Sequence, residues 1–319
     1  MARSLLNHNS AVLKVIACNN NLSYQDLGRK SAQALGFSVG GAADEYAYCH
    51  ANSLVKNELG TPALEITLGQ CTFEALQDCE IAITGAHCLP QVDQEKANFN
   101  QAFVLKKGQT LTLSPPLLGV FTYLSIRGGL QVKQWQNSVT QIARERVFGL
   151  TAPHITDGET LFVGTNEPYQ RASLLPFTTA NLAGLDETIT VRFIPTTLYK
   201  SLPLREQLDI EQAIYQISPN SDRMGYRLTS DVKVSFDKNK NLRSLSMPVA
   251  AGMIQISNDG LPIILMKDSQ TIGGYPVLGS VIKIDLFKLA QLRPGQSLKF
   301  VPCSLQFAST QLEMFYAKF

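Results

Sequence analysis

The sequence is dominated by short runs in which every second residue is apolar. The clearest are at Leu64, Ile66 and Leu68; Ile81 and Ile83; Leu111 and Leu113; Leu124 and Ile126; Val191 and Phe193; and Ile282, Ile284 and Leu286. This spacing places the apolar side chains on one face of a β-strand. Because clusters of Gly, Pro, Asn and Asp separate the runs, we predict a mostly β fold with few short helices.

One segment carries a helical pattern instead. It follows Gly40–Gly41, where Asp44 is suited to cap the first turn. Behind it, four apolar residues share one face at positions i, i+4, i+7 and i+8, namely Ala47, Ala51, Leu54 and Val55. We expect this helix to pack against the β structure.

Three segments repeat a glycine turn followed by an alternating strand: 105–113, 155–163 and 292–300. This repetition favours two similar β-barrel halves. The stretch 166–181 is polar, contains prolines and shows no periodicity, so it reads as a linker. We therefore expect an N-terminal β-barrel domain at 1–170 and a C-terminal one at 171–319.

Composition excludes several classes of protein. The 319 residues are 45% hydrophobic and carry a net charge of only +2, so neither a disordered chain nor a nucleic-acid-binding protein is expected. Apolar stretches such as 261–266 are too short for a membrane helix. The first ten residues lack the apolar core of a secretion signal, which favours a cytoplasmic protein.

The six cysteines are expected to be reduced and buried. Two of them stand beside histidines, in the pairs Cys49–His50 and His87–Cys88. Adjacent residues point in different directions on a strand or helix, so each pair would supply one metal ligand at best. We identify no metal ligand set.

Familiar catalytic signatures are weak or missing. Residues 36–40 match the G-x-S-x-G nucleophile pattern, but no apolar strand precedes them, so we expect Ser38 to be dispensable. No phosphate-binding loop follows a predicted strand. Residues 265–268 partly resemble a biotin attachment site but lack its flanks, so we expect no covalent biotin on this chain.

Two segments are rich in groups that bind small polar molecules. In the first, 221–227, Arg223 and Arg227 stand near Asp222, and an arginine can bind a carboxylate with two hydrogen bonds. The alternative is a surface turn in which Arg223 pairs with Asp222. In the second, 255–276, a strand leads to a Gly-Gly turn and supplies Gln255, Asp268, Gln270, Thr271, Gly273 and Gly274. We predict one cleft lined by Arg223, Asp268, Gln270 and Thr271, close to the helix near Asp44.

These segments belong to a longer pattern along most of the chain. It comprises QDLGR at 25–29, GGAAD at 40–44, AN at 51–52, ALEI at 63–66, YLSIRGG at 123–129, SDRMGYRL at 221–228, DSQTIGGYP at 268–276 and AQLRPG at 290–295. With these segments the sequence resembles the family of 5-oxoprolinase C subunits, also described as allophanate hydrolase subunit 2 and as biotin-dependent carboxyltransferases.

The resemblance implies two tandem cyclophilin-like β-barrels and a B-like partner protein, with an A-like partner as well in 5-oxoprolinase. It implies ATP-dependent opening of 5-oxoproline to glutamate, with ATP bound through the complex. Such chemistry needs positive charge beside the phosphoryl group and a carboxylate that positions water. Candidates by residue type are Arg127, Arg223 and Arg227 for the charge and Glu65, Asp222 and Asp268 for the carboxylate; Gly128, Gly129, Asp44 and Asn52 complete the expected binding residues.

Two alternatives stay open within the same fold. One is carboxyl transfer to a urea-like amide, with the backbone amides of Gly128–Gly129 or Gly273–Gly274 holding the oxyanion. The other is a regulatory subunit that antagonises an inhibitor of a sensor kinase. The region 136–153 departs from the family's glycine-rich pattern, which adds a paralogue with altered or reduced activity as a further alternative.

Overall fold

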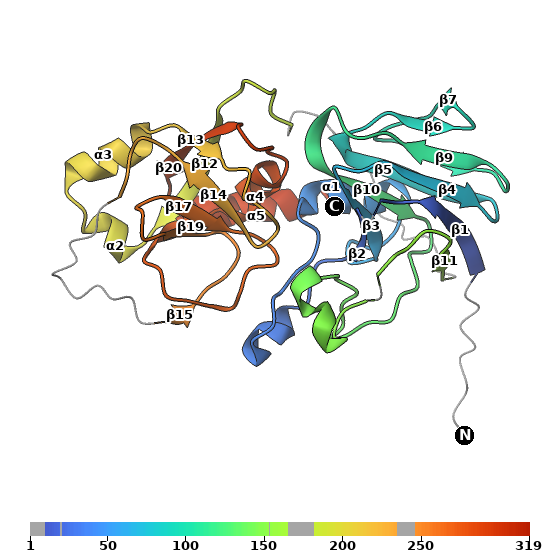
Figure 1. The fold of residues 1–319 in the computed structure, drawn as a ribbon, viewed down its shortest axis with the longest axis horizontal. Coiled ribbons are helices and arrows are strands. Elements are labelled where there is room, and N and C mark those ends of the chain that lie inside the picture. The colour runs from blue at the N-terminus through green and yellow to red at the C-terminus, as the bar shows by residue number, and fades with distance from the viewer. Residues whose placement is uncertain (1–9, 20, 153, 165–181, 235–245) are drawn as a thin grey trace. The chain divides into compact units, whose positions relative to one another are not determined.

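The computed structural model describes residues 10–19, 21–152, 154–164, 182–234 and 246–319. The chain divides into two compact units (Figure 1). The first comprises Met1–Gly28, Glu45–Thr178 and Phe319, and the second comprises Arg29–Asp44 and Thr179–Lys318. The expected boundary between residues 170 and 171, and the expected linker at 166–181, lie outside the described residues.

The first unit contains two antiparallel sheets. The six-stranded sheet has the order β11-β1-β4-β9-β6-β7, formed by Thr160–Val163, Ser10–Ala17, Cys71–Ala75, Thr110–Leu113, Pro90–Val92 and Glu95–Lys96. The five-stranded sheet has the order β2-β3-β10-β5-β8, formed by Leu22–Gln25, Ala63–Thr67, Leu118–Ile126, Cys79–His87 and Ala102–Leu105.

Side chains from both sheets meet in one core. Val15 and Phe73 come from the six-stranded sheet, and Leu64 and Leu124 come from the five-stranded one. Helix α1 (Glu45–Leu54) contacts β5 and β10, and Thr84 on β5 donates a hydrogen bond to the carbonyl of Ala47 at 2.7 Å. The predicted helix after Asp44 is therefore confirmed. A short 3-10 helix, η2 (Ala143–Phe148), follows β10.

The second unit contains a closed barrel with the strand order β12-β19-β16-β17-β14-β13-β20. Parallel pairing of β20 with β12 closes it. The strands are β12 (Ile189–Pro195), β13 (Tyr215–Ile217), β14 (Gly225–Thr229), β16 (Met253–Ile256), β17 (Pro262–Leu265), β19 (Val277–Val281) and β20 (Ser297–Pro302). A separate two-stranded ribbon pairs β15 (Met247–Pro248) with β18 (Ile272–Gly273).

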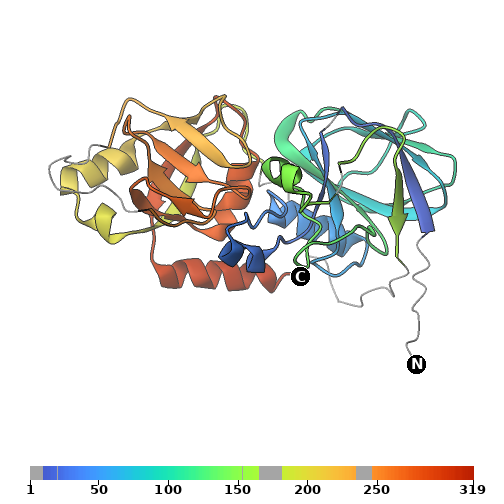
Figure 2. The same cartoon turned by 60° about the horizontal axis from the view of Figure 1, so that its bottom comes forward.

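Helices accompany this barrel: η1 (Lys30–Leu35), α2 (Thr197–Lys200), α3 (Leu204–Gln212), α4 (Lys283–Ala290) and α5 (Leu305–Tyr316). Figure 2 shows α5 running beside the barrel. The rings of Phe287 on α4 and Phe315 on α5 lie 5.0 Å apart. The segment 282–286 was predicted as a strand, which is wrong, because Leu286, Leu289 and Ala290 are buried at the three- and four-residue spacing of a helix.

The mostly β prediction is confirmed, but the prediction of two closed barrels holds only for the second unit. Period-two alternation determines which face of a strand is buried. It does not determine whether the two edge strands of a sheet pair with each other and close a barrel. In the first unit the strands form two sheets that share a core. Among the helices of the described residues, none is both long and apolar enough to span a bilayer.

Candidate functional site

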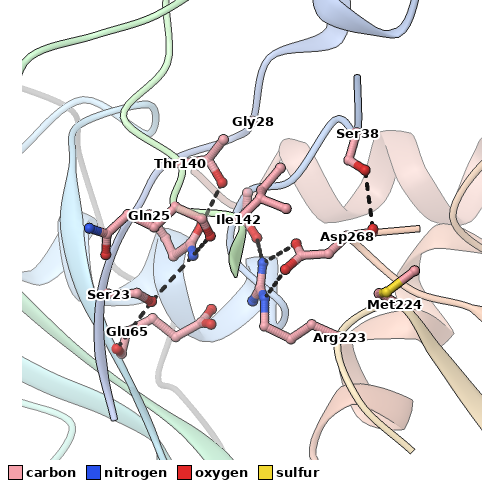
Figure 3. Close-up of polar contacts among 12 residues, drawn as sticks. Ser23, Gln25, Gly28, Ser38, Glu65, Thr140, Ile142, Arg223, Met224 and Asp268 are labelled. Carbon is pink, nitrogen blue, oxygen red and sulfur yellow. Dashed lines mark hydrogen bonds and ion pairs between the residues drawn. The ribbon is translucent and has the colours of Figure 1, made fainter. Parts of the chain in front are cut away.

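Arg223 and Asp268 form a bidentate ion pair in the second unit. The Nε and Nη2 atoms of Arg223 lie 3.0 and 2.8 Å from the two carboxylate oxygens of Asp268 (Figure 3). The side chains are only 18% and 8% exposed. The expected pairing of Arg223 with its neighbour Asp222, kept open as the alternative, is therefore not the one formed.

Strand pairing explains why these two residues meet. Arg223 stands just before β14 and Asp268 just after β17, and these strands are antiparallel neighbours, so the two ends lie side by side. The backbone N–H of Asp268 also donates to the carbonyl of Arg223 at 2.8 Å. Asp222 shapes the turn, because its carboxylate accepts from the N–H groups of Met224 and Gly225 at 2.8 and 3.3 Å.

The segment 29–44 packs onto the loop that carries Asp268. Arg223 Nη2 donates to the carbonyl of Gly41 at 2.8 Å, and the N–H of Gly40 donates to the carbonyl of Lys267 at 3.0 Å. Thr271 Oγ1 reaches the carbonyl of Gly36 at 3.3 Å. Gly40 and Gly41 have φ of +66° and +91°, which suits glycine at this turn.

Ser38 has a structural role in this segment. It is fully buried, and its hydroxyl donates to the backbone carbonyls of Asp268 at 3.1 Å and Ser269 at 2.7 Å. A 3-10 helix, η1, precedes it where a nucleophile elbow requires a strand. The structure thus agrees with the exclusion of a serine nucleophile.

The other predicted residues of the second unit differ in their surroundings. Asp44 is buried and accepts a hydrogen bond from Gln291 Nε2 at 2.8 Å. Gln255 is 1% exposed and lies beneath Gly273, whereas Gly274 is exposed. Gln270 and Thr271 are half-buried on the loop after Asp268.

Arg227 points outward from the barrel, because its neighbours Tyr226 and Leu228 are the buried positions of β14.

Five predicted residues belong to the first unit and serve its internal packing. Glu65 is fully buried on β3 and accepts a hydrogen bond from Tyr123 at 2.7 Å. Asn52 donates to the carbonyl of Thr61 at 2.9 Å. Arg127 forms an ion pair with Glu80 at 2.7 Å and is partly exposed.

The remaining two are Gly128 and Gly129, whose N–H groups form hydrogen bonds within the chain. The N–H of Gly128 donates to Asn57 Oδ1 and that of Gly129 donates to the carbonyl of Ile126, both at 3.0 Å. A Cβ at Gly128 would lie 2.5 Å from the carbonyl oxygen of Gly164, so the glycine serves close backbone packing. An oxyanion at this pair would have to compete with these hydrogen bonds, and the oxyanion role stays a prediction.

Our sequence reading missed a buried polar network in the first unit. Asp26 accepts hydrogen bonds from Ser138 Oγ at 2.7 Å and from the N–H of Val139 at 2.8 Å. Gln25 Oε1 accepts from Thr140 Oγ1 at 2.7 Å (Figure 3). The motif QDLGR at 25–29 was the available signal, but its partners lie more than a hundred residues away.

No group of three or more metal-ligating side chains occurs among the described residues. All six cysteines are free thiols, five of them buried and Cys303 half-buried. Burial raises the pKa of Cys88 to about 11 and lowers the pKa of His50 to about 4. The thiol is therefore protonated at neutral pH, unlike a metal-binding thiolate.

Comparisons with known proteins agree on one family. A family model described as "Carboxyltransferase domain, subdomain A and B" matches residues 35–302. The C subunit of 5-oxoprolinase from Escherichia coli (strain K12) is 34% identical over 298 residues, covering 92% of each chain. Urea amidolyase of Saccharomyces cerevisiae is 27% identical over 298 residues, covering 89% of this chain but 16% of that protein.

Solved structures share the fold. The urea carboxylase of Kluyveromyces lactis matches with a TM-score of 0.83 and 25% identity, covering 98% of this chain and 29% of that chain. TTHA0988 matches with a TM-score of 0.77 and 26% identity, and this chain spans 55% of its length. Because the family model takes in most of both units and the Escherichia coli relative matches nearly end to end, the chain belongs to the carboxyltransferase domain A and B family.

Proposed function

We propose that this chain is one component of an ATP-dependent 5-oxoprolinase, which opens 5-oxoproline to glutamate only in complex with partner subunits. The observation that carries the proposal is the 34% identity to the C subunit of 5-oxoprolinase across 92% of both chains. The expected partners are a B-like and an A-like protein of the same enzyme, and the expected compartment is the cytoplasm.

The chemistry has two demands. A lactam is a poor electrophile, so transfer of the γ-phosphoryl group of ATP to its oxygen, with release of ADP, makes the ring carbon reactive towards water. Addition of water then breaks the C–N bond, and a second water releases the phosphate to leave glutamate. The negative charge that develops on the phosphoryl oxygens during the transfer then needs a fixed cation nearby. Since no phosphate-binding loop follows a predicted strand, we expect ATP to bind through the complex.

Arg223 is our candidate for the cation. Asp268 and the carbonyl of Gly41 fix its guanidinium group, so little side-chain entropy is lost when it binds an anion. Asp268 would act as the positioning residue for Arg223. The substrate carboxylate or a phosphoryl oxygen would be the bound group.

Carboxyl transfer is the second candidate, favoured by the family model and by the structural likeness to urea carboxylase. In that reaction the chain would accept carboxybiotin from another domain, because we expect no biotin on this chain. A regulatory role without catalysis is the third.

The test is to purify the chain with the proteins encoded beside it and to measure glutamate release from 5-oxoproline with and without ATP. ATP-dependent release supports the proposal. If the complex instead consumes carboxybiotin in the presence of urea, carboxyl transfer is the function. Activity in neither assay, together with stable partner binding, supports the regulatory role.

A further inference from the structure

Gln255 carries a buried amide with no hydrogen-bond acceptor. The residue is 1% exposed, and its Nε2 atom has no partner. More than nine in ten buried polar groups in proteins are paired, so an unpaired amide at this depth requires an explanation. Replacing this amide N–H group by an apolar group would cost the fold no hydrogen bond.

The amide lies on the outer wall of the barrel. Residues Arg227, Ile263, Gln255 and Val277 are in register across β14, β17, β16 and β19. Arg227, at one end of this row, is exposed, which identifies the row as the outer face. Gln255 therefore points out of the barrel core, towards the loop 269–276 that covers it.

The cover over Gln255 consists of bare backbone. A Cβ atom at Gly273 would lie 2.5 Å from Gln255 Nε2 and 3.2 Å from Val249 Cγ1. Any side chain at position 273 would have to displace the amide. Because glycine has no Cβ, the backbone at this position can lie this close to the amide.

This cover is held by a short ribbon and by a few hydrogen bonds, among them Val249 N–H to the carbonyl of Thr271 at 2.9 Å and Thr271 Oγ1 to the carbonyl of Gly36 at 3.3 Å. Gly273 lies in the ribbon of β15 and β18, which has only two residue pairs, Met247 with Gly273 and Pro248 with Ile272. Proline has no N–H, so one of the pairs lacks a donor. Met247 and Ile272 are 42% and 61% exposed, so lifting the ribbon uncovers little of these two side chains, while the hydrogen bonds of Val249 and Thr271 have to break.

We propose that Gln255 is a substrate-binding residue whose Nε2 donates a hydrogen bond to the carbonyl oxygen of a small amide once the ribbon has lifted. A neutral carbonyl fits better than a carboxylate, because the apolar neighbours Val249, Ile263 and Val277 would desolvate a charge. The proposal rests on the proposed function in that the lactam of 5-oxoproline supplies such a carbonyl.

The first test compares two methionine variants in the purified complex. Gln255→Met is expected to raise the KM for 5-oxoproline about tenfold or more and to leave the melting temperature unchanged or higher. Gln296 is the matched control, since this buried glutamine donates to the carbonyl of Gly184 at 2.9 Å and accepts from the N–H of Arg293 at 2.8 Å. Gln296→Met should lower the melting temperature and leave the KM unchanged. An unchanged KM in Gln255→Met overturns the proposal.

A second measurement does not depend on turnover. The side-chain amide signal of Gln255 in an NMR spectrum of the full chain is assigned by its loss in Gln255→Met. It should shift on addition of 5-oxoproline or urea and stay in place with glutamate, which has no amide carbonyl. If only urea shifts the signal and the complex releases no glutamate, the binding role of Gln255 is supported and the proposed 5-oxoprolinase function is contradicted. If neither 5-oxoproline nor urea shifts the Gln255 signal, the proposed role of Gln255 is overturned.

Discussion

At the scale of residues, the ion pair of Arg223 and Asp268 dominates the candidate site. Because both side chains are mostly buried, Arg223→Ala leaves a carboxylate in a poorly solvated position. We expect the free energy of unfolding to fall by about 3 kcal/mol. The measurement is urea denaturation, with the exposed Arg227→Ala as the control in the same segment, where a change below about 0.5 kcal/mol is expected. Equal effects of the two variants would contradict the structural importance of the pair.

A second prediction at this scale concerns pH. Burial lowers the pKa of His50 from 6.5 to about 4, so between these values the unfolded chain binds a proton that the folded chain does not. The contribution of the neutral His50 side chain to the free energy of unfolding is therefore complete above pH 6.5 and is lost as the pH falls towards 4. The loss amounts to about 3 kcal/mol. Denaturation at pH 5 and pH 7.5 should show a smaller difference in His50→Gln than in the natural chain, and identical differences would refute the prediction.

At the scale of elements, the segment 29–44 is attached to the second unit through Ser38. The hydroxyl reaches two backbone carbonyls, so Ser38→Ala should cost about 1–2 kcal/mol of stability. The kcat of the reconstituted complex should be nearly unchanged, whereas loss of a nucleophile lowers kcat by about ten-thousandfold or more. Ser269→Ala is the control, since it keeps the carbonyl that accepts from Ser38. A collapse of kcat in Ser38→Ala with normal folding would restore the nucleophile hypothesis.

At the scale of the whole molecule, the chain matches only part of some relatives. It spans 55% of TTHA0988 and 29% of the Kluyveromyces urea carboxylase, so those proteins carry further segments in the same chain. We expect the isolated chain to release no glutamate from 5-oxoproline and ATP, and addition of the partner proteins to start the release. A coupled glutamate assay measures both. Sustained release by the isolated chain would show that the partners are not required.

The sequence alone was sufficient for the features that depend on neighbouring residues. Alternation identified strands such as β3, β5 and β10, and the Asp44 signal identified the start of α1. These patterns reflect local geometry, in which one face of a strand or helix is buried. Local pattern failed at 282–286, where Ile282, Ile284 and Leu286 fit a strand in sequence, but burial against the barrel selected a helix.

Only the tertiary structure decided what depends on distant pairing. Arg223 meets Asp268 because β14 and β17 are neighbours, and Ser38 reaches the same loop across 230 residues. The barrel closes through β20 and β12, while equally alternating strands of the first unit form two sheets. The unpaired amide of Gln255 is likewise a consequence of the tertiary structure, because the ribbon that buries it lies at a distance in the sequence. Sequence period sets which side of an element is buried, and the long-range pairing of strands sets which residues share a site.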